Sequence, residues 1–343
     1  MSVARTAATL ILAITFVTTI CAPMLAPLDP AEQHVDFPYA PPLRPRLIDR
    51  YGGWHMPFVY PVRLSNRLMR DYVEDSARAI PIWQPWRSGS VESGMVFLLG
   101  TDGLGRDLLS RLLVGARWSL GLAAAATILA LAIGTLVGAV AGYADGLFDE
   151  IGMRVAELVV VLPTLYVLLA IRGALPLVLE PQQVFAGATM ALGLLGWPAI
   201  ARGVRAICAV EARLDYVEAA RAAGASHAHV LFRHILPAAG GFLRAQATVL
   251  LAAFVVAEMT LSFTGFGFAE PTPSWGTILR DTGSISTLSD YPWLLAPAGV
   301  MAILSWSLHT IGGSVPSAHE PGYWSRATAS KLTPRDMPPT RTS

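Results

Sequence analysis

The ionisable residues that could do chemistry are few in this sequence and unevenly placed. Charged residues make up 14% of the 343 residues, against about 25% in a typical soluble domain. One group lies between two long apolar segments, at residues 202 to 244. It comprises Arg202, Arg205, Arg213, Arg221, Arg233 and Arg244, with Glu211, Asp215 and Glu218. No motif for covalent chemistry accompanies these charges, so we expect a contact surface here rather than a reaction centre.

Sequence motifs for covalent chemistry are missing. A phosphate-binding loop requires G-x-x-x-x-G-K-[ST], but the only lysine, Lys331, follows "RATAS". No H-E-x-x-H helix or G-x-S-x-G turn occurs. Cys21 and Cys208 lie far apart beside or within apolar segments, which predicts neither a disulfide framework nor a metal cluster. We therefore expect a chain that is not an enzyme, binds no metal or cofactor, and receives energy from another polypeptide.

The elements that must position these residues are membrane spans. Hydrophobic residues make up 53% of the chain, and a span requires about 20 consecutive apolar residues. Six candidates cover approximately residues 7–28, 118–141, 155–179, 184–201, 245–268 and 293–313. Pro163 and Arg172 interrupt the third candidate. The pattern predicts an all-α polytopic membrane protein with about six transmembrane helices.

The first apolar segment, residues 1–28, has two interpretations. Because Arg5 precedes a short apolar stretch, it could be a cleaved signal peptide. No clear A-x-A cleavage site follows it, and Ile20 before Cys21 is a poor context for lipoprotein cleavage. We favour an uncleaved N-terminal transmembrane helix, and the remaining topology is the same in either case.

The arginines between the fourth and fifth candidate spans predict the orientation. Short loops rich in Lys and Arg remain in the cytoplasm, so this loop is expected there. Alternating spans then place the N-terminus, the turn "GYADGLFDEIGMR" and the tail at 316–343 on the same side. The tail's Arg326, Lys331, Arg335 and Arg341 agree with this orientation.

Residues 29–97 are predicted to form a small extracytoplasmic insert, followed by a core domain at 98–315. The insert contains several arginines, but a loop of this length translocates largely regardless of its charge. Prolines cluster in "FPYAPPLRPR", and "HMPFVYPVRL" has the β-branched and aromatic content of strands. The insert could pack against the membrane core or contact a soluble partner, and the sequence leaves both open.

The arginine-rich loop contains a predicted helical hairpin at residues 206–237. Apolar residues recur in its first half at spacings of three and four, at Ile207, Val210, Leu214 and Val217. This pattern predicts one amphipathic helix. Gly224 can take a positive φ and end that helix, and Pro237 suits the start of the next span. The general alternative is an interfacial helix that only seals the membrane surface.

The hairpin resembles the signature loop of ABC importer permease subunits, E-A-A, three residues, G, nine residues, I-x-L-P. Here the pattern is Glu218-Ala219-Ala220, Gly224 and His234-Ile235-Leu236-Pro237, with His234 in place of the first isoleucine. In that family the hairpin docks on a separate ATP-hydrolysing subunit. The resemblance implies that the contact residues are Glu218, Ala219, Ala220, Arg221, Ala222, Ala223 and Gly224.

Two further segments resemble the dipeptide, oligopeptide and nickel permeases of the same family. "GTDGLGRD", residues 100–107, is similar to their G-T-D-x-x-G-R-D segment, and here Thr101 or Asp102 is expected to cap a helix beginning near Leu104. "AEMTLSFTGFGFAEPTPSWGTIL" is similar to their E-x-x-L-S-F-x-G-x-G and P-P-x-P-S-W-G stretches. The stretch "SLHTIGGSVPSAHEP" departs from the family's L-G-D-G-L-R-D ending, since it lacks the aspartates and the arginine.

The resemblance implies a type I ABC importer permease in the bacterial inner membrane. Its implied partners are a second related permease, two cytoplasmic ATPase subunits that use ATP, an extracytoplasmic solute-binding protein and membrane lipid, without nucleic acid. Peptides are the first expected substrate, and nickel or other small solutes the second. An ion-driven secondary transporter is a rival, although more spans or broken repeats would be expected of it. A non-transporting scaffold or receptor is the other rival.

Polar and small residues within the candidate spans suggest further roles. Glu258 lies in the fifth span, and intramembrane charges face the bundle interior or a water-filled path. It could line the translocation path or form hydrogen bonds between helices. Gly134, Gly138 and Gly142 recur at every fourth position of the second span. This stripe permits close contact with a neighbouring helix in this subunit or in a partner.

Overall fold

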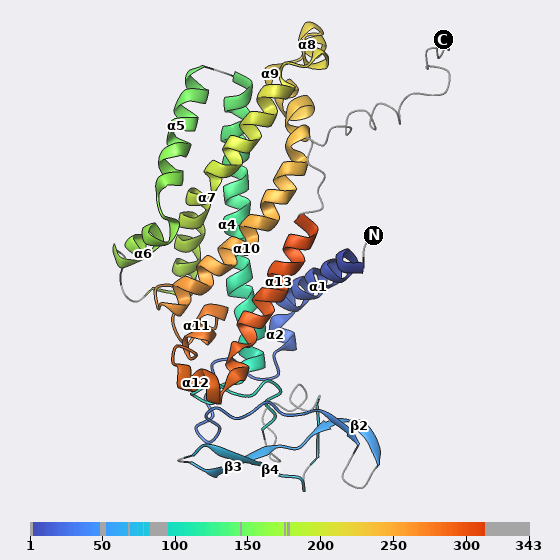
Figure 1. Cartoon of the computed structure of the whole chain (residues 1–343), viewed down its shortest axis with the longest axis vertical. Helices are drawn as coiled ribbons and strands as arrows, with labels where there is room; N and C mark the ends of the chain where they lie inside the picture. The colour runs from blue at the N-terminus through green and yellow to red at the C-terminus, as the bar shows by residue number, and fades with distance from the viewer. Residues whose placement is uncertain are drawn as a thin grey trace, which may run out of the picture.

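The computed structural model describes residues 3–48, 53–67, 69–77, 79–82, 95–144, 146–174, 176 and 179–312. The helices form an elongated bundle (Figure 1). One end, here called the hairpin end, carries α8 (Asp215–Ala222) and α9 (His227–Val230). The opposite end, the insert end, carries the strands. The tail predicted at 316–343 lies outside the described residues.

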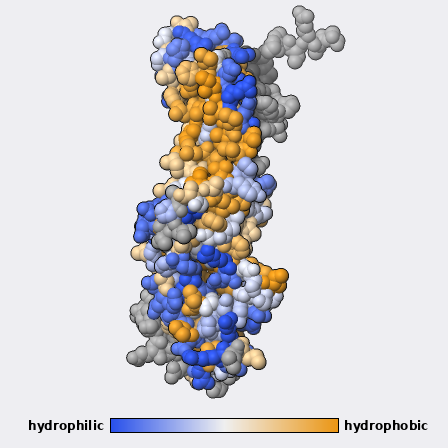
Figure 2. Space-filling model, turned by 90° about the vertical axis from the view of Figure 1, so that its left-hand side faces the viewer, coloured by the Kyte–Doolittle hydropathy of each residue, from blue (hydrophilic) through white to orange (hydrophobic). Residues whose placement is uncertain are grey.

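The bundle is built from long apolar helices. They are α1 (Val3–Ile20), α4 (Leu108–Ala144), α5 (Leu147–Val161), α6 (Thr164–Ala174), α7 (Pro181–Glu211), α10 (Gly240–Phe263) and α13 (Ala296–Gly312). Five helical stretches in the described part of the chain are long and apolar enough to cross a membrane, and α5 with α6 makes a sixth if this bent pair is one span. An apolar band covers the helical part of the face in Figure 2, with hydrophilic residues toward both ends. The predicted all-α polytopic fold is confirmed.

The third predicted span is broken at Pro163, between α5 and α6. Proline disfavours the α conformation in the residue before it, and Leu162 is extended, with φ −71° and ψ 124°. The two helices consequently meet at 82°. At the hairpin end, the guanidinium Nε of Arg205 on α7 donates to Asp149 Oδ1 of α5 at 2.7 Å, which holds α5 beside α7.

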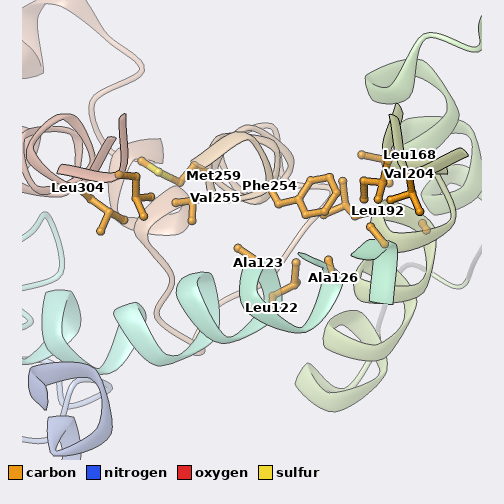
Figure 3. Packing of buried hydrophobic residues seen from close by; sticks show 14 of the residues in the cluster. Leu122, Ala123, Ala126, Leu168, Leu192, Val204, Phe254, Val255, Met259 and Leu304 are labelled. Atoms are coloured by element: carbon orange, nitrogen blue, oxygen red, sulfur yellow. The ribbon is translucent and has the colours of Figure 1, made fainter. Parts of the chain in front are cut away.

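The main core lies among α4, α7 and α10. Figure 3 shows side chains from these helices, together with Leu168 of α6 and Leu304 of α13, meeting between the ribbons. The labelled residues are Leu122, Ala123, Ala126, Leu168, Leu192, Val204, Phe254, Val255, Met259 and Leu304. Alanines on α4 leave room for the larger side chains of α10, so this core is filled by alternating small and large residues.

The fifth span is longer than predicted because the helix does not start at Pro237. Residues from His227 to Phe263 form one continuous helical stretch. Between α9 and α10 it passes through a π-helix (Leu231–Ile235) and a 3₁₀ helix (Leu236–Ala239). Proline has no N–H for an α-helical bond. The local change of helical pitch accommodates Pro237 without ending the rod.

The insert contains two small antiparallel sheets. One has the order β1 (Arg46–Ile48), β2 (Trp54–Val59), β5 (Ile80–Pro81), and the other pairs β3 (Val62–Asn66) with β4 (Asp71–Glu74). The stretch predicted to be strand-like, "HMPFVYPVRL", lies in β2 and β3 as expected. A separate apolar cluster supports the sheets: Ala40, Leu43, Val59, Val62, Ile80, Val96 and Phe97.

The insert packs against the membrane core, which was one of its two interpretations. The ring of Tyr39 stacks on that of Tyr291 with centroids 4.1 Å apart, and the guanidinium of Arg70 covers the Tyr39 ring at 4.8 Å. The backbone N–H of Ala40 donates to Thr101 Oγ1 at 2.7 Å. These contacts attach the insert to the segments that precede α4 and α13.

Short helices complete the insert end. They are α2 (Ala22–Leu25), α11 (Trp275–Arg280), α12 (Ile285–Asp290) and the 3₁₀ helix Pro292–Leu295. α11 begins with a capping box, because Ser274 Oγ accepts from the N–H of Thr277 and Thr277 Oγ1 accepts from that of Ser274. This fixes the "PSWGT" segment as a rigid turn against α4 and α10.

The second span, predicted at about 118–141, lies within α4, but the helix predicted just ahead of it begins later than expected. The chain before α4 was expected to begin a helix near Leu104, capped by Thr101 or Asp102. The helix instead begins at Leu108, and Asp107 Oδ2 caps it by accepting from the N–H of Ser110 at 2.8 Å.

Candidate functional site

The hairpin has two separate helices in its first half, where one amphipathic helix was predicted. α7 ends at Glu211 and α8 begins at Asp215. Leu214 is extended, with φ −83° and ψ 146°, which breaks the helical path. The hydroxyl of Tyr216 donates to Glu211 Oε2 at 2.6 Å and bridges the break. The apolar spacing did not reveal this break, and the predicted apolar face is not buried as one side: Val217 is fully buried, whereas Val210 and Leu214 are exposed.

α8 ends in a glycine turn, as the sequence predicted. Gly224 has φ +85°, a conformation that side chains disfavour. The N–H of Ala225 donates to the carbonyl of Ala220 at 3.1 Å, and that of Gly224 to Arg221 at 2.9 Å. This pair of bonds is a Schellman motif. Ser226 then caps α9 by accepting from the N–H of His229. Hydrogen bonds thus fix the end of the first arm and the start of the second.

Most of the predicted contact residues lie on the outside of the hairpin. Ala220 is half-buried, and the exposed members are Glu218, Ala219, Arg221, Ala222, Ala223 and Gly224. On the inner side, Val217 and Val230 are fully buried and join the main core. The hairpin therefore presents small side chains, with the charged Glu218 and Arg221 among them, on a packed base. Alanine is also the best helix former, which keeps this surface helical.

Two side chains of the hairpin contact the end of α4. The hydroxyl of Tyr143 lies 2.8 Å from Nδ1 of His227 in α9. The guanidinium carbon of Arg221 in α8 lies 5.0 Å from the centroid of the same tyrosine ring, within range of a cation–π interaction. Tyr143 thus contacts both arms, a feature that no motif in the sequence indicated.

The three glycines of the second span face α7 of the same chain. A Cβ on Gly134 would lie 2.7 Å from the carbonyl oxygen of Trp197, one on Gly138 2.4 Å from that of Ala201, and one on Gly142 2.5 Å from that of Arg205. Backbone therefore lies against backbone along the hairpin half of α4. Of the two neighbours left open by the sequence, the contact is made within this subunit.

Glu258 is enclosed between α4, α10 and α11. It is only 2% exposed, and its Oε1 accepts from Ser262 Oγ at 2.7 Å. Ser262 Oγ in turn accepts from the N–H of Phe268, so the carboxylate supports the turn that follows α10. Because Ser262 belongs to the same helix, this bond does not join two helices, and both roles considered for Glu258 stay predictions.

A buried charge network at the insert end was not predicted. Arg106 and Arg111 are 3% and 0% exposed, and both pair with Glu270 and with Asp102. Arg111 Nη2 lies 2.9 Å from Glu270 Oε1 and Arg106 Nε 2.7 Å from Asp102 Oδ2. A short contact joins Arg106 to Glu270 as well. The network connects the "GTDGLGRD" segment and α4 to the loop that follows α10.

The network controls the ionisation of its carboxylates. Burial favours the neutral form of Glu270, but hydrogen bonds and charges from Arg111 and Arg106 hold the pKa of Glu270 below its ordinary value. Asp107 lies beside the network without an arginine partner of its own in the described structure. Its burial raises the pKa of Asp107 to about 6. The two arginines thus favour the charged form of Glu270, whereas burial favours the neutral form of Asp107.

The fold and the site define a class of protein: a multi-span membrane protein whose chemistry lies in contact surfaces at its two ends. The profile of the family described as "Binding-protein-dependent transport system inner membrane component" matches residues 134–322. The chain belongs to this family, the permease subunits of ABC importers. The resemblance drawn from the three sequence motifs is confirmed.

Relatives of known name agree. The chain is 34% identical over 223 residues to the oligopeptide transport system permease protein OppC of Bacillus subtilis (strain 168), covering 65% of this chain and 70% of that one. It is 33% identical over 207 residues to OppC of Lactococcus lactis subsp. cremoris (strain SK11), covering 60% and 69%. Among solved structures, the inward-facing MetNI methionine ABC transporter is similar at TM-score 0.46 and 20% identity, covering 60% of this chain and 96% of that one.

Membership fixes the general setting of the molecule. The chain is a multi-span protein of the bacterial inner membrane, and permeases of this family operate with ATPase subunits and a solute-binding protein. An ion-driven transporter and a non-transporting scaffold, the two rivals, do not belong to this family. The family relationship also gives meaning to the exposed hairpin.

Proposed function

We propose that this chain is a peptide-translocating permease whose hairpin, residues 218–224, docks on a cytoplasmic ATPase subunit. It pairs with a second, related permease, and two ATPase subunits bind the pair. The chain performs no reaction and binds no cofactor itself, since ATP is used by the ATPase subunits. Closure of the ATPases moves the hairpins, and the helices follow as rigid bodies to open the path to the other side.

The observation that carries this proposal is the small-residue surface of α8 on its buried base. Ala219, Ala222 and Ala223 are exposed, so a partner can approach the helix backbone closely. Val217 beneath them is fully buried, so force on the surface reaches the core without first deforming a loop. Apart from Tyr216, the exposed side chains of α8 are small or charged, whereas a helix that only sealed the membrane surface would expose a whole face of large apolar side chains toward the lipid.

The distribution of charge supports an orientation with the hairpin end in the cytoplasm. Arg202, Arg213 and Arg233 are exposed near that end, and short arginine-rich loops remain on the cytoplasmic side. The insert is at the opposite end of the bundle (Figure 1). This orientation directs the insert toward the solute-binding protein and places the N-terminus and the C-terminal tail in the cytoplasm.

Peptides are the proposed substrate because the named relatives are oligopeptide permeases. Nickel or another small solute is the second candidate. The two are separated by uptake into proteoliposomes that contain the reconstituted importer, with labelled tripeptide, labelled pentapeptide and nickel as probes. Uptake of a peptide but not of nickel supports the proposal, and the reverse result overturns the substrate assignment.

The hairpin assignment is tested with two glycine variants in the same assay. A Cβ on Gly224 or on Gly240 meets nothing within 4 Å, but only Gly224 has a positive φ. Gly224→Ala therefore strains the turn by about 1–2 kcal/mol, whereas Gly240→Ala is unstrained in its helix. We expect Gly224→Ala to lower ATP-dependent uptake severalfold while Gly240→Ala does not. Equal uptake by the two variants would contradict a role for the turn in coupling.

A further inference from the structure

Along the sequence the hairpin connects α7 to α10, and α4 has no direct covalent connection to it. α7 leads into α8 through residues 212–214, and α9 continues into α10 as one helical stretch. α4 contributes a large share of the core and extends from the hairpin end to the charge network, where it holds Arg111. A movement of the hairpin therefore reaches α4 only through noncovalent contacts, either by packing on α7 and α10 or by direct contacts with the hairpin itself.

Tyr143, in the last turn of α4, makes these contacts with both arms. Its hydroxyl is 2.8 Å from His227 Nδ1 on the second arm, and the two rings are 5.9 Å apart at an edge-to-face angle. Its ring face is 5.0 Å from the Arg221 guanidinium on the first arm. The hydroxyl therefore contacts the second arm, and the ring face contacts the first arm. Replacing the tyrosine by phenylalanine removes the hydroxyl contact and keeps the ring contact.

We propose that Tyr143 is a positioning residue that carries the movement of the hairpin to α4. The inference rests on the proposed function, because it takes residues 218–224 to be the surface that the ATPase moves. We call the contacts of Tyr143 with His227 and Arg221 the tie. With the tie in place, α4, α7 and α10 receive the displacement together. Without it, α4 follows only through its packing on α7 and α10.

The glycine contacts make this tie consequential. Gly138 and Gly142 bring the backbone of α4 against that of α7, which resists separation of the helices but leaves sliding along their axes less restricted. Tyr143 and His227 prevent such sliding at the hairpin end, because a hydrogen bond weakens steeply when its atoms move apart. Coupling of α4 to the hairpin therefore depends on the close glycine contacts with α7 and on the contact between Tyr143 and His227.

The test uses Tyr143→Phe, which removes the hydroxyl and keeps the ring under Arg221. A hydrogen bond of this kind is worth a factor of about 2 to 10, so uptake per ATP hydrolysed should fall by that factor in the reconstituted importer. Basal ATP hydrolysis should stay unchanged, which a merely unfolded variant would not show. His227→Ala should have the same effect, and the double variant should be no worse than either single one. His229→Ala, two residues along, is the matched control.

A crosslink separates this inference from the proposed function. Ala222→Cys, in a background where Cys21 and Cys208 are replaced, reports contact with the ATPase subunit in both the parent and the Tyr143→Phe protein. A crosslink in both, with uptake per ATP lowered only in Tyr143→Phe, supports the inference. A crosslink in both with uptake per ATP unchanged overturns the inference alone. No crosslink in the parent overturns the proposed function and the inference with it.

Discussion

Replacing Glu270 by glutamine should destabilise the insert end more than its position in a loop suggests. Glu270 pairs with Arg111 at 2.9 Å and also with Arg106. The two guanidinium groups are 0% and 3% exposed. After the substitution, Asp102 is the remaining carboxylate in the network to balance two buried positive charges.

The size of the effect follows from burial. Breaking a fully buried ion pair by removing one partner costs about 3–5 kcal/mol. The Glu270 side chain is 37% exposed, so water screens part of the electrostatic interaction. We therefore expect the free energy of unfolding to fall by about 2 kcal/mol. At about 2–4 °C per kcal/mol, the thermal midpoint should fall by about 4–8 °C. The matched control is Glu74→Gln, because Glu74 pairs with Arg46 at the exposed surface, where a pair is worth less than about 1 kcal/mol.

The assay is thermal unfolding of the purified protein in detergent, followed by a double-mutant cycle with Arg111→Met. The cycle should show a coupling of about 1–2 kcal/mol between the two positions. If Glu270→Gln shifts the midpoint no more than Glu74→Gln, and the cycle is additive, the network does not hold the loop and this reasoning is refuted.

Two further outcomes are expected of thermal unfolding in detergent. Gly138→Ala should lower the free energy of unfolding by about 1–3 kcal/mol, because its Cβ would lie 2.4 Å from a backbone oxygen of α7. Gly187→Ala is the control, since a Cβ there meets nothing within 4 Å. Equal thermal midpoints of the two variants would show that the helices are not in close contact. The raised pKa of Asp107, about 6 against an ordinary 3.8, means that at a pH between these two values the folded protein holds a proton which the unfolded chain has released. Stability should therefore rise as the pH falls from 7 to 5, and Asp107→Asn should remove about 1 kcal/mol of that rise; an unchanged pH dependence would contradict the burial of this carboxyl.

Local sequence signals predicted the features that depend on local physics. Runs of apolar residues located the spans, since the bilayer sets their length. Gly224 marked the turn, because few other residues tolerate its positive φ. Pro163 marked the break in the third span, because it forces the preceding residue out of the helical region.

Features formed between distant residues were not predicted. Arg111 and Glu270 are 159 positions apart, and neither has a neighbour in sequence that indicates its partner. Two local features were missed as well: the break after Glu211, which the hydroxyl of Tyr216 bridges, and the continuous helix through Pro237, which needs a change of helical pitch. In each case a tertiary contact or a local adjustment decided between structures that the sequence pattern allowed equally.

Site-specific crosslinking from the hairpin tests the central claim most directly. In membranes that contain the assembled importer, a single cysteine at Ala222 should crosslink to an ATPase subunit, with a yield that changes when ATP is bound. A cysteine at Asp290, exposed at the insert end, should not reach that subunit. Labelling of the Ala222 cysteine from outside the cell, or a crosslink from Asp290 in its place, would contradict the account.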